Sequence, residues 1–161
     1  MNSKRLAKWI KISLAVLAIL CVLGAIYTIV SFYLQDAYID SLPDEQKELS
    51  DGLGLAISLI YFRIPNVALN AISFIYSLAL FIKFSNSVKK DNEKLSLVAT
   101  IPFLIIILIT LFFTYLTIAT SVYFDIIATA IGVLQLAGAI FALVYSIINT
   151  KATKLSKEKI E

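Results

Sequence analysis

Residues 53–84 read LGLAISLIYFRIPNVALNAISFIYSLALFIKF, and this tract decides how many times the chain crosses a membrane. As a single helix it would be about 48 Å long. It would then hold Arg63 within the hydrocarbon, where an arginine costs about 2.5–3.5 kcal/mol. A span that begins at Ile64 or Pro65 avoids this cost, because the proline then stands in the first helical turn and Arg63 reaches the outer headgroups. We therefore predict a second span over residues 64–84, close to the roughly 20 residues that a bilayer needs.

The ten residues before this break, 53–62, are too few to cross a bilayer. Ser41 and Asp44 have the spacing of a helix-capping box, and the apolar residues that follow recur at helical spacing. These apolar residues are Leu42, Leu49, Leu53, Ala56 and Ile60. We therefore predict an amphipathic outer helix over residues 42–62 that lies in the membrane interface. A re-entrant segment and an extension of the second span are the alternatives for residues 53–62.

The other spans follow from three uncharged tracts. Residues 12–34 carry no charge and follow four basic residues. A secretory signal would have a shorter apolar region, of about 7–15 residues, and a small-residue cleavage site. We therefore predict that residues 12–34 form the first span. The uncharged residues on either side of Asp125 predict a hairpin with spans over residues 96–118 and 125–148.

The composition agrees with this assignment of spans. The chain has 60% apolar and 16% charged residues and a mean hydropathy of +0.89. A water-soluble domain of this size normally has about 25% charged residues. The sequence therefore predicts an all-α fold in one polytopic domain over residues 1–161. We expect an integral membrane antiparallel four-helix bundle with an additional outer interfacial helix.

The distribution of charge predicts the orientation. Twelve of the fourteen basic residues lie in the N-terminal segment, the loop over residues 83–94 and the C-terminal tail, whereas seven of the eleven acidic residues lie in the opposite segments. The positive-inside rule then predicts a multi-pass plasma-membrane protein with both termini cytoplasmic. Aromatic residues near the expected boundaries form two belts. They are Tyr33, Tyr38, Tyr61, Tyr123 and Phe124 on the outer side and Trp9, Phe84 and Tyr145 on the inner side.

Small and polar residues follow one face of each span, at alternating steps of four and three residues. In lipid such residues mark the contacts between helices, so we expect these four stripes to face inward. The first stripe is Cys21, Gly24, Thr28, Ser31 and Gln35, and the second is Arg63, Asn66, Asn70, Ser73 and Ser77. The third is Ser96, Thr100, Phe103, Ile107, Thr110, Thr114, Thr117 and Ser121. The fourth is Asp125, Ala128, Gly132, Gln135, Ala139, Ala142, Ser146 and Asn149.

Five residues of these stripes are the candidate ligand-binding site. Arg63 and Asp125 stand near the outer boundary, Asn66 and Asn70 follow Arg63 on its stripe, and Gln135 lies deeper. Ionisable groups and amides are costly in hydrocarbon and often mark a functional site. The same residues also fit an ion pair with amide partners that locks the two hairpins together. Snorkelling of Arg63 and helix capping by Asp125 are a further structural interpretation.

The residue inventory argues against catalysis. The chain has no histidine and one cysteine, so imidazole metal sites and Ser-His-Asp catalysis are absent. No span carries two carboxylates, and no inward segment carries a glycine-rich phosphate loop. The acidic outer loop does not have the spacing of an EF-hand loop. We therefore expect no enzyme activity, no catalytic residues, no metal site and no cofactor.

Transport by a single bundle is also disfavoured. Small four-span multidrug exporters carry a glutamate in their first helix, and this chain has none between Lys11 and Asp36. The inner halves of the four stripes are apolar, so they do not line a polar pore. The residues concerned are Leu17, Leu80, Ile107 and Ala142.

The remaining class is a small non-enzymatic membrane protein that acts through protein–protein or lipid interaction. An accessory, a regulatory or an immunity-type subunit would fit this description. Its expected partners are the lipid bilayer and either a larger membrane protein or further copies of itself in a homo-oligomer, and we expect no nucleic acid. A small-solute or ion transporter or channel subunit that works as an oligomer is the alternative.

Overall fold

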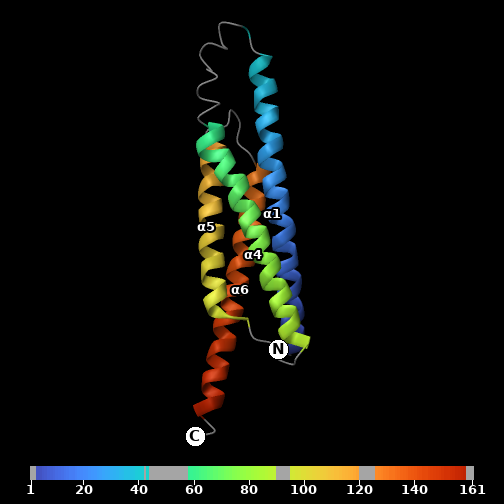
Figure 1. The fold of residues 1–161 in the computed structure, drawn as a ribbon, viewed down its shortest axis with the longest axis vertical. Helices are drawn as coiled ribbons and strands as arrows, with labels where there is room; N and C mark the ends of the chain where they lie inside the picture. Colours follow the sequence, from blue (N-terminus) through green and yellow to red (C-terminus); the bar gives the residue numbers. More distant parts are fainter. Residues whose placement is uncertain (1–2, 42, 44–57, 90–94, 120–125, 159–161) are drawn as a thin grey trace.

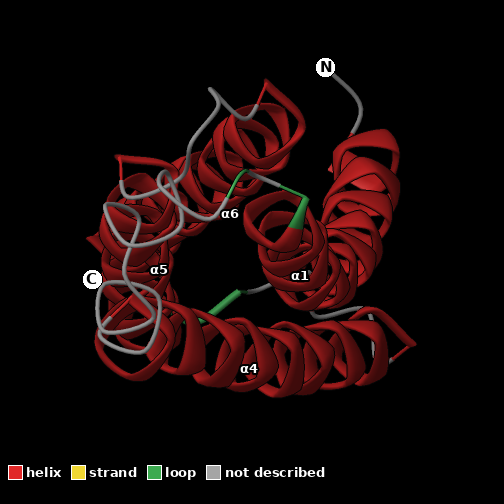
Figure 2. Cartoon of the chain, turned by 90° about the horizontal axis from the view of Figure 1, so that it is seen from above, coloured by secondary structure: helices red, strands yellow, loops and turns green. Residues whose placement is uncertain are grey.

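The computed structural model describes residues 3–41, 43, 58–89, 95–119 and 126–158. Within them lie the helices α1 (Ser3–Asp40), α4 (Ile64–Lys89), α5 (Leu97–Ala119) and α6 (Ile126–Glu158), and a π-helix, η1 (Leu59–Arg63). The four α-helices run alternately up and down (Figure 1). Seen from above they form a ring in which α1 packs against α4 and α6, and α5 packs against the same two (Figure 2). These helices confirm the predicted all-α four-helix bundle.

Each of the four helices contains a segment long and apolar enough to cross a membrane. The four segments are Arg5–Asp40, Leu59–Lys89, Leu97–Ala119 and Ile126–Thr150. The chain is therefore a multi-pass membrane protein with four spans. The start of α1, the end of α4 and the end of α6 lie together at the bottom of Figure 1.

We call this bottom end the basic end, because Lys8, Lys11 and Lys89 lie there, and the other end the acidic end, because Asp36 and Asp40 lie there. Helices α1 and α6 are 38 and 33 residues long. At 1.5 Å per residue both exceed the roughly 30 Å of hydrocarbon in a bilayer. As a result α1 extends beyond its neighbours at the acidic end, and α6 does so at the basic end (Figure 1).

Most of the outer helix predicted over residues 42–62 falls outside the described residues. Residues 42 and 44–57 lie outside the described part of the chain, and no interfacial helix is shown in the part that is described. Residues 58–62 instead belong to the second membrane helix, which runs from Ser58 through η1 into α4. The predicted break at Arg63 is therefore wrong, and the alternative of a longer second helix holds for residues 58–62.

Pro65 explains how the helix continues through this point. A proline inside a helix lacks an N–H donor, and its ring crowds the carbonyl of the residue four positions earlier, here Tyr61. The π-turn Leu59–Arg63 widens the helix just before the proline, and the Ile64 N–H closes it by donating to the Leu59 carbonyl. Membrane helices use such local π-turns to satisfy backbone groups that a proline frees. The sequence predicts a helix start here because of the insertion cost of Arg63 and the suitability of Pro65 for a first helical turn.

The half of the bundle nearer the basic end is packed by apolar side chains. The largest buried ones are Ile10, Leu14, Leu17, Phe84, Phe103 and Ile107. Gly138 on α6 allows α1 to approach closely, because a Cβ atom there would lie 2.8 Å from Leu17 Cγ. Shape complementarity of this kind holds membrane helices together, since lipid offers apolar surfaces of its own.

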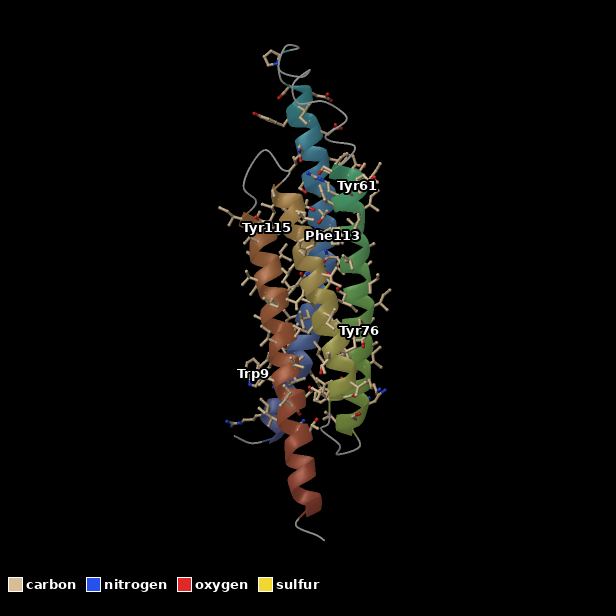
Figure 3. The ribbon with its side chains drawn as sticks, turned by 90° about the vertical axis from the view of Figure 1, so that its left-hand side faces the viewer. Trp9, Tyr61, Tyr76, Phe113 and Tyr115 are labelled. Carbon is tan, nitrogen blue, oxygen red and sulfur yellow. The ribbon has the colours of Figure 1, made fainter. Side chains whose placement is uncertain are left out.

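The predicted aromatic belts are correct in part. Trp9 lies near the basic end and Tyr61 near the acidic end (Figure 3), and both side chains are exposed. The inner-belt prediction is wrong for Phe84 and Tyr145, which are buried. Their rings meet edge to face, with centroids 5.6 Å apart. These two residues lie on the faces of α4 and α6 that also carry the small and polar stripes, and those faces point inward. The two aromatic rings therefore pack in the core instead of reaching the headgroups.

Gly138→Leu is expected to destabilise the bundle, because the added side chain collides with Leu17. Overpacking of this kind typically costs about 1–3 kcal/mol. The measurement is unfolding of the purified protein in mixed detergent micelles. Ala137→Leu is the matched control, because Ala137 is exposed on the adjacent face. Equal stability of the two variants would contradict the tight contact between α1 and α6.

Candidate functional site

The four stripes predicted from the sequence face the interior of the bundle. Of their described members, all are buried or half-buried except Ser96. Arg63, Asn66 and Asn70 on α4 and its preceding turn are each at most 3% exposed, and Gln135 on α6 is 1% exposed. Four of the five candidate site residues therefore lie inside the bundle. The fifth, Asp125, lies outside the described residues.

The structure brings three of the candidate residues into one chain of hydrogen bonds. Gln135 Nε2 donates to Asn70 Oδ1 at 3.0 Å and to the Leu20 carbonyl at 3.2 Å. Asn70 Nδ2 in turn donates to the Asn66 Oδ1 atom at 2.8 Å and to the Asn66 carbonyl at 3.0 Å. The carboxamide of Gln135 thus joins α6 to both α4 and α1.

The fourth helix joins this network through hydroxyl groups. Thr114 Oγ1 on α5 donates to the Thr110 carbonyl at 2.9 Å and lies 3.4 Å from Asn66 Oδ1. The Ser73 and Thr110 hydroxyls lie 3.4 Å apart, one step nearer the basic end. All four helices therefore contribute a polar group to one buried cluster, which we call the amide network.

The amide network depends on a close approach of α1. A Cβ atom at Gly24 would lie 2.7 Å from Asn70 Oδ1, so glycine leaves room for the carboxamide. A cavity of about 10 Å³ remains beside Gly24, and the carboxamide residues that line it are Asn70 and Gln135. Thr28 and Thr114 line it as well. This volume is at the lower limit for one water molecule, which needs about 10–15 Å³ and several polar partners. The amide network is therefore nearly closed and has no room for a larger ligand.

Arg63 lies apart from the amide network, against α1. Its Nη1 donates to Ser31 Oγ at 3.4 Å, and its Nη2 donates to Gln35 Oε1. The guanidinium carbon stands 5.4 Å from the centroid of the Phe32 ring, a cation–π arrangement. At 2% exposure the side chain stays inside the bundle. Arg63 therefore does not extend out of the bundle along its own helix, as a snorkelling side chain would, because Ser31 and Gln35 of α1 supply acceptors beside it.

Sequence reasoning missed the residues that bind Arg63. The stripe on the first span contains Ser31 and Gln35, but periodicity alone does not pair them with Arg63. A pairing of Arg63 with Asp125, the interpretation that the sequence offers, lies outside the described residues. The missing signal was relative depth: Ser31 and Gln35 stand near the end of the first span, and Arg63 stands near the start of the second. In an antiparallel hairpin these positions meet at the same level.

A groove opens on the surface next to Arg63, between α1 and α4. Its volume is about 460 Å³, and the residues that line it are apolar apart from Arg63, Thr28 and Tyr33. It is distinct from the amide network, although Thr28 borders both. Two different environments therefore adjoin inside this end of the bundle. The amide network is nearly closed, whereas Arg63 borders a groove that is open to the surface and has mostly apolar walls.

The chemistry available here is hydrogen bonding and charge recognition. Carboxamides and aliphatic hydroxyls do not ionise near neutral pH, and a guanidinium keeps its proton. Among the described residues, no group of three or more His, Cys, Asp or Glu side chains could hold a metal ion. The arrangement is suited to holding helices together and to binding an anion.

Comparison of the chain with protein-family models, with curated proteins and with solved structures found no match.

Asn70 and Gln135 are expected to be energetically coupled, because their side chains share a hydrogen bond inside the bundle. The test compares unfolding of Asn70→Ala, Gln135→Ala and the double variant in detergent micelles. The double variant should be less destabilised than the sum of the two single variants, with a coupling of about 0.6–1.7 kcal/mol. The pair Ser146→Ala and Gln135→Ala is the control, because Ser146 bonds Thr100 and not the amide network. Strict additivity for Asn70 and Gln135 would contradict the network.

Proposed function

We propose that this chain is a small non-enzymatic membrane protein that acts by binding other membrane components, as an accessory, regulatory or immunity-type subunit. The observation that supports this proposal is the closed apolar half of the bundle. Leu17, Leu80, Ile107 and Ala142, one from each helix, are at most 4% exposed there. An ion that crossed this layer would lose its hydration without gaining ligands, and that cost is tens of kcal/mol in a medium of low dielectric constant.

The hydroxyl groups in this half do not form a path. Ser77 donates to the Leu14 carbonyl at 2.8 Å, and the Thr100 and Ser146 hydroxyls lie 2.9 Å apart. Each of these groups therefore has a protein partner, and Phe84, Phe103 and Tyr145 belong to the buried apolar cluster of the same half. A single bundle supports binding better than conduction.

The two ends of the bundle offer surfaces for such binding. At the basic end, Arg5 and Lys8 are exposed on α1, and α6 continues to Glu158. Clusters of basic residues next to a span attract anionic lipids and acidic partners. At the acidic end, α1 extends past the other helices and exposes Asp36 and Asp40. We propose that the basic end faces the cytoplasm of a cell whose plasma membrane holds the protein, because this orientation satisfies the positive-inside rule.

The orientation predicts which positions a membrane-impermeant maleimide reaches in intact cells. Cys21 is the only cysteine and is buried, so Cys21→Ala gives a background free of thiols. In that background Ser41→Cys at the acidic end should react in intact cells. Asn86→Cys at the basic end should react only after the membrane is permeabilised. Both positions are exposed in the structure, so accessibility within the protein does not bias the result. The reverse pattern would overturn the proposed orientation.

The function itself is tested by flux through liposomes that contain the purified protein. Cations, anions and small neutral solutes should cross no faster than in empty liposomes, since the apolar half closes the bundle. A flux that Arg63→Ala abolishes and Lys83→Ala preserves would contradict the proposal. That outcome would support the alternative, an oligomeric transporter or channel subunit. Lys83 is a suitable control because it is exposed at the basic end.

A further inference from the structure

The groove beside Arg63 has the size and the walls of a ligand site. Its volume of about 460 Å³ is in the range of small-molecule sites, about 300–1,000 Å³. Ile29, Phe32 and Val67 contribute apolar walls, and Arg63 is the only charged residue among those that line it. A site with one cation and apolar walls suits a molecule that has an anionic group and a hydrocarbon part.

We propose that this groove binds one anionic phospholipid, whose phosphate contacts the Arg63 guanidinium and whose acyl chain lies along the apolar walls. The proposal rests on the function proposed above and deepens it, since it names lipid as one of the membrane components that the protein binds.

The position of Arg63 favours a phosphate. A guanidinium presents its donors in a planar fork that matches phosphate oxygens and binds them in a bidentate manner. The neutral side chains of Ser31 and Gln35 and the face of Phe32 orient this guanidinium, so it is held in place before a ligand arrives. Charge-assisted hydrogen bonds gain strength where water is scarce.

The groove runs from the membrane surface toward the interior, as a lipid molecule does. Along the second membrane helix its lining runs from Leu59 to Ala68, which is about 13 Å at 1.5 Å per residue. Leu59 is the end nearer the membrane surface, and Ala68 is the deeper end. Arg63 therefore lies toward the surface, where headgroups are, and Val67 and Ala68 lie where acyl chains are. The π-turn that ends at Arg63 forms part of this site, and π-turns often occur at functional sites.

A lipid fits the groove better than the helix of a partner protein. The lining covers residues 28–33 of α1 and 59–68 of the second membrane helix, whereas a partner helix would run along the full hydrocarbon thickness of about 30 Å. Contacts between membrane helices also favour small residues, but the exposed rims of the groove carry Ile29, Tyr33 and Ile64.

Fluorescence quenching by brominated lipids tests the proposal in detergent micelles. Trp9 is the only tryptophan, so Trp9→Phe gives a silent background. Tyr33→Trp then reports from the groove. Tyr115→Trp reports from the lipid-facing side of α5, where the side chain is equally exposed, at 67% against 66%. The quenchers are brominated phosphatidylglycerol and brominated phosphatidylcholine with identical acyl chains.

The Tyr33→Trp reporter should prefer the anionic lipid by about tenfold in half-saturating mole fraction, the ratio expected for one additional charge-assisted contact. Tyr115→Trp should show no preference. Arg63→Gln should remove the preference at the groove, Arg63→Lys should retain part of it, and Lys83→Gln should leave it unchanged. Inorganic phosphate should not displace the lipid, because it makes no contact with the apolar walls.

A second variant guards against misfolding of Arg63→Gln. Ala68→Phe keeps the arginine and fills the deeper end of the groove, and Ala68 is exposed, so the bundle tolerates the larger side chain. This variant should weaken quenching by both lipids at Tyr33→Trp and leave Tyr115→Trp unchanged.

Three outcomes would overturn the lipid site: equal quenching by the two lipids at Tyr33→Trp, a preference that survives Arg63→Gln in a folded protein, or displacement of the lipid by inorganic phosphate. These measurements involve no solute gradient and no protein partner. A failure of the lipid site is therefore distinct from a failure of the proposed function, which is judged by flux through liposomes.

Discussion

The carboxamide of Gln135 holds three helices at once, and the geometry of the bundle depends on this interaction. One amide nitrogen donates to Asn70 on α4 and to the Leu20 carbonyl on α1. Inside a membrane no water replaces a lost partner, so an unsatisfied amide costs several kcal/mol. A shift of α6 by one residue would rotate Gln135 by about 100° and break both bonds. The amide network therefore selects one register of α6 against its neighbours, whereas apolar contacts alone tolerate several.

The inward faces of the helices could be predicted from the sequence, but the pairs that meet there could not. In a membrane, the helix face that carries small and polar residues is favourable only against other helices. This rule correctly predicts that the stripe of Asn66, Asn70 and Ser77 faces the interior of the bundle. Which residues pair depends on how far each helix is shifted along its neighbours. Periodicity does not contain that shift, and so it does not show that Ser31 and Gln35 are the residues that meet Arg63.

The predicted break at Arg63 was wrong for a related reason. Insertion costs for arginine describe a side chain that faces lipid, whereas this guanidinium faces Ser31, Gln35 and the ring of Phe32. Its environment is set by tertiary structure, and no scale that treats one helix at a time includes it. Phe84 and Tyr145 illustrate the opposite case. Their position near a boundary suggested a headgroup belt, but the faces that carry them point inward, and the two rings pack edge to face.

The two halves of the bundle have different mechanical roles. Near the basic end the helices fit by shape around Leu17, Phe103 and Ile107, and any separation there opens a cavity. Near the acidic end α1 meets the second membrane helix through Arg63, and hydrogen bonds can be exchanged without opening a cavity. A phosphate in the groove would meet a guanidinium that Ser31, Gln35 and the ring of Phe32 already orient.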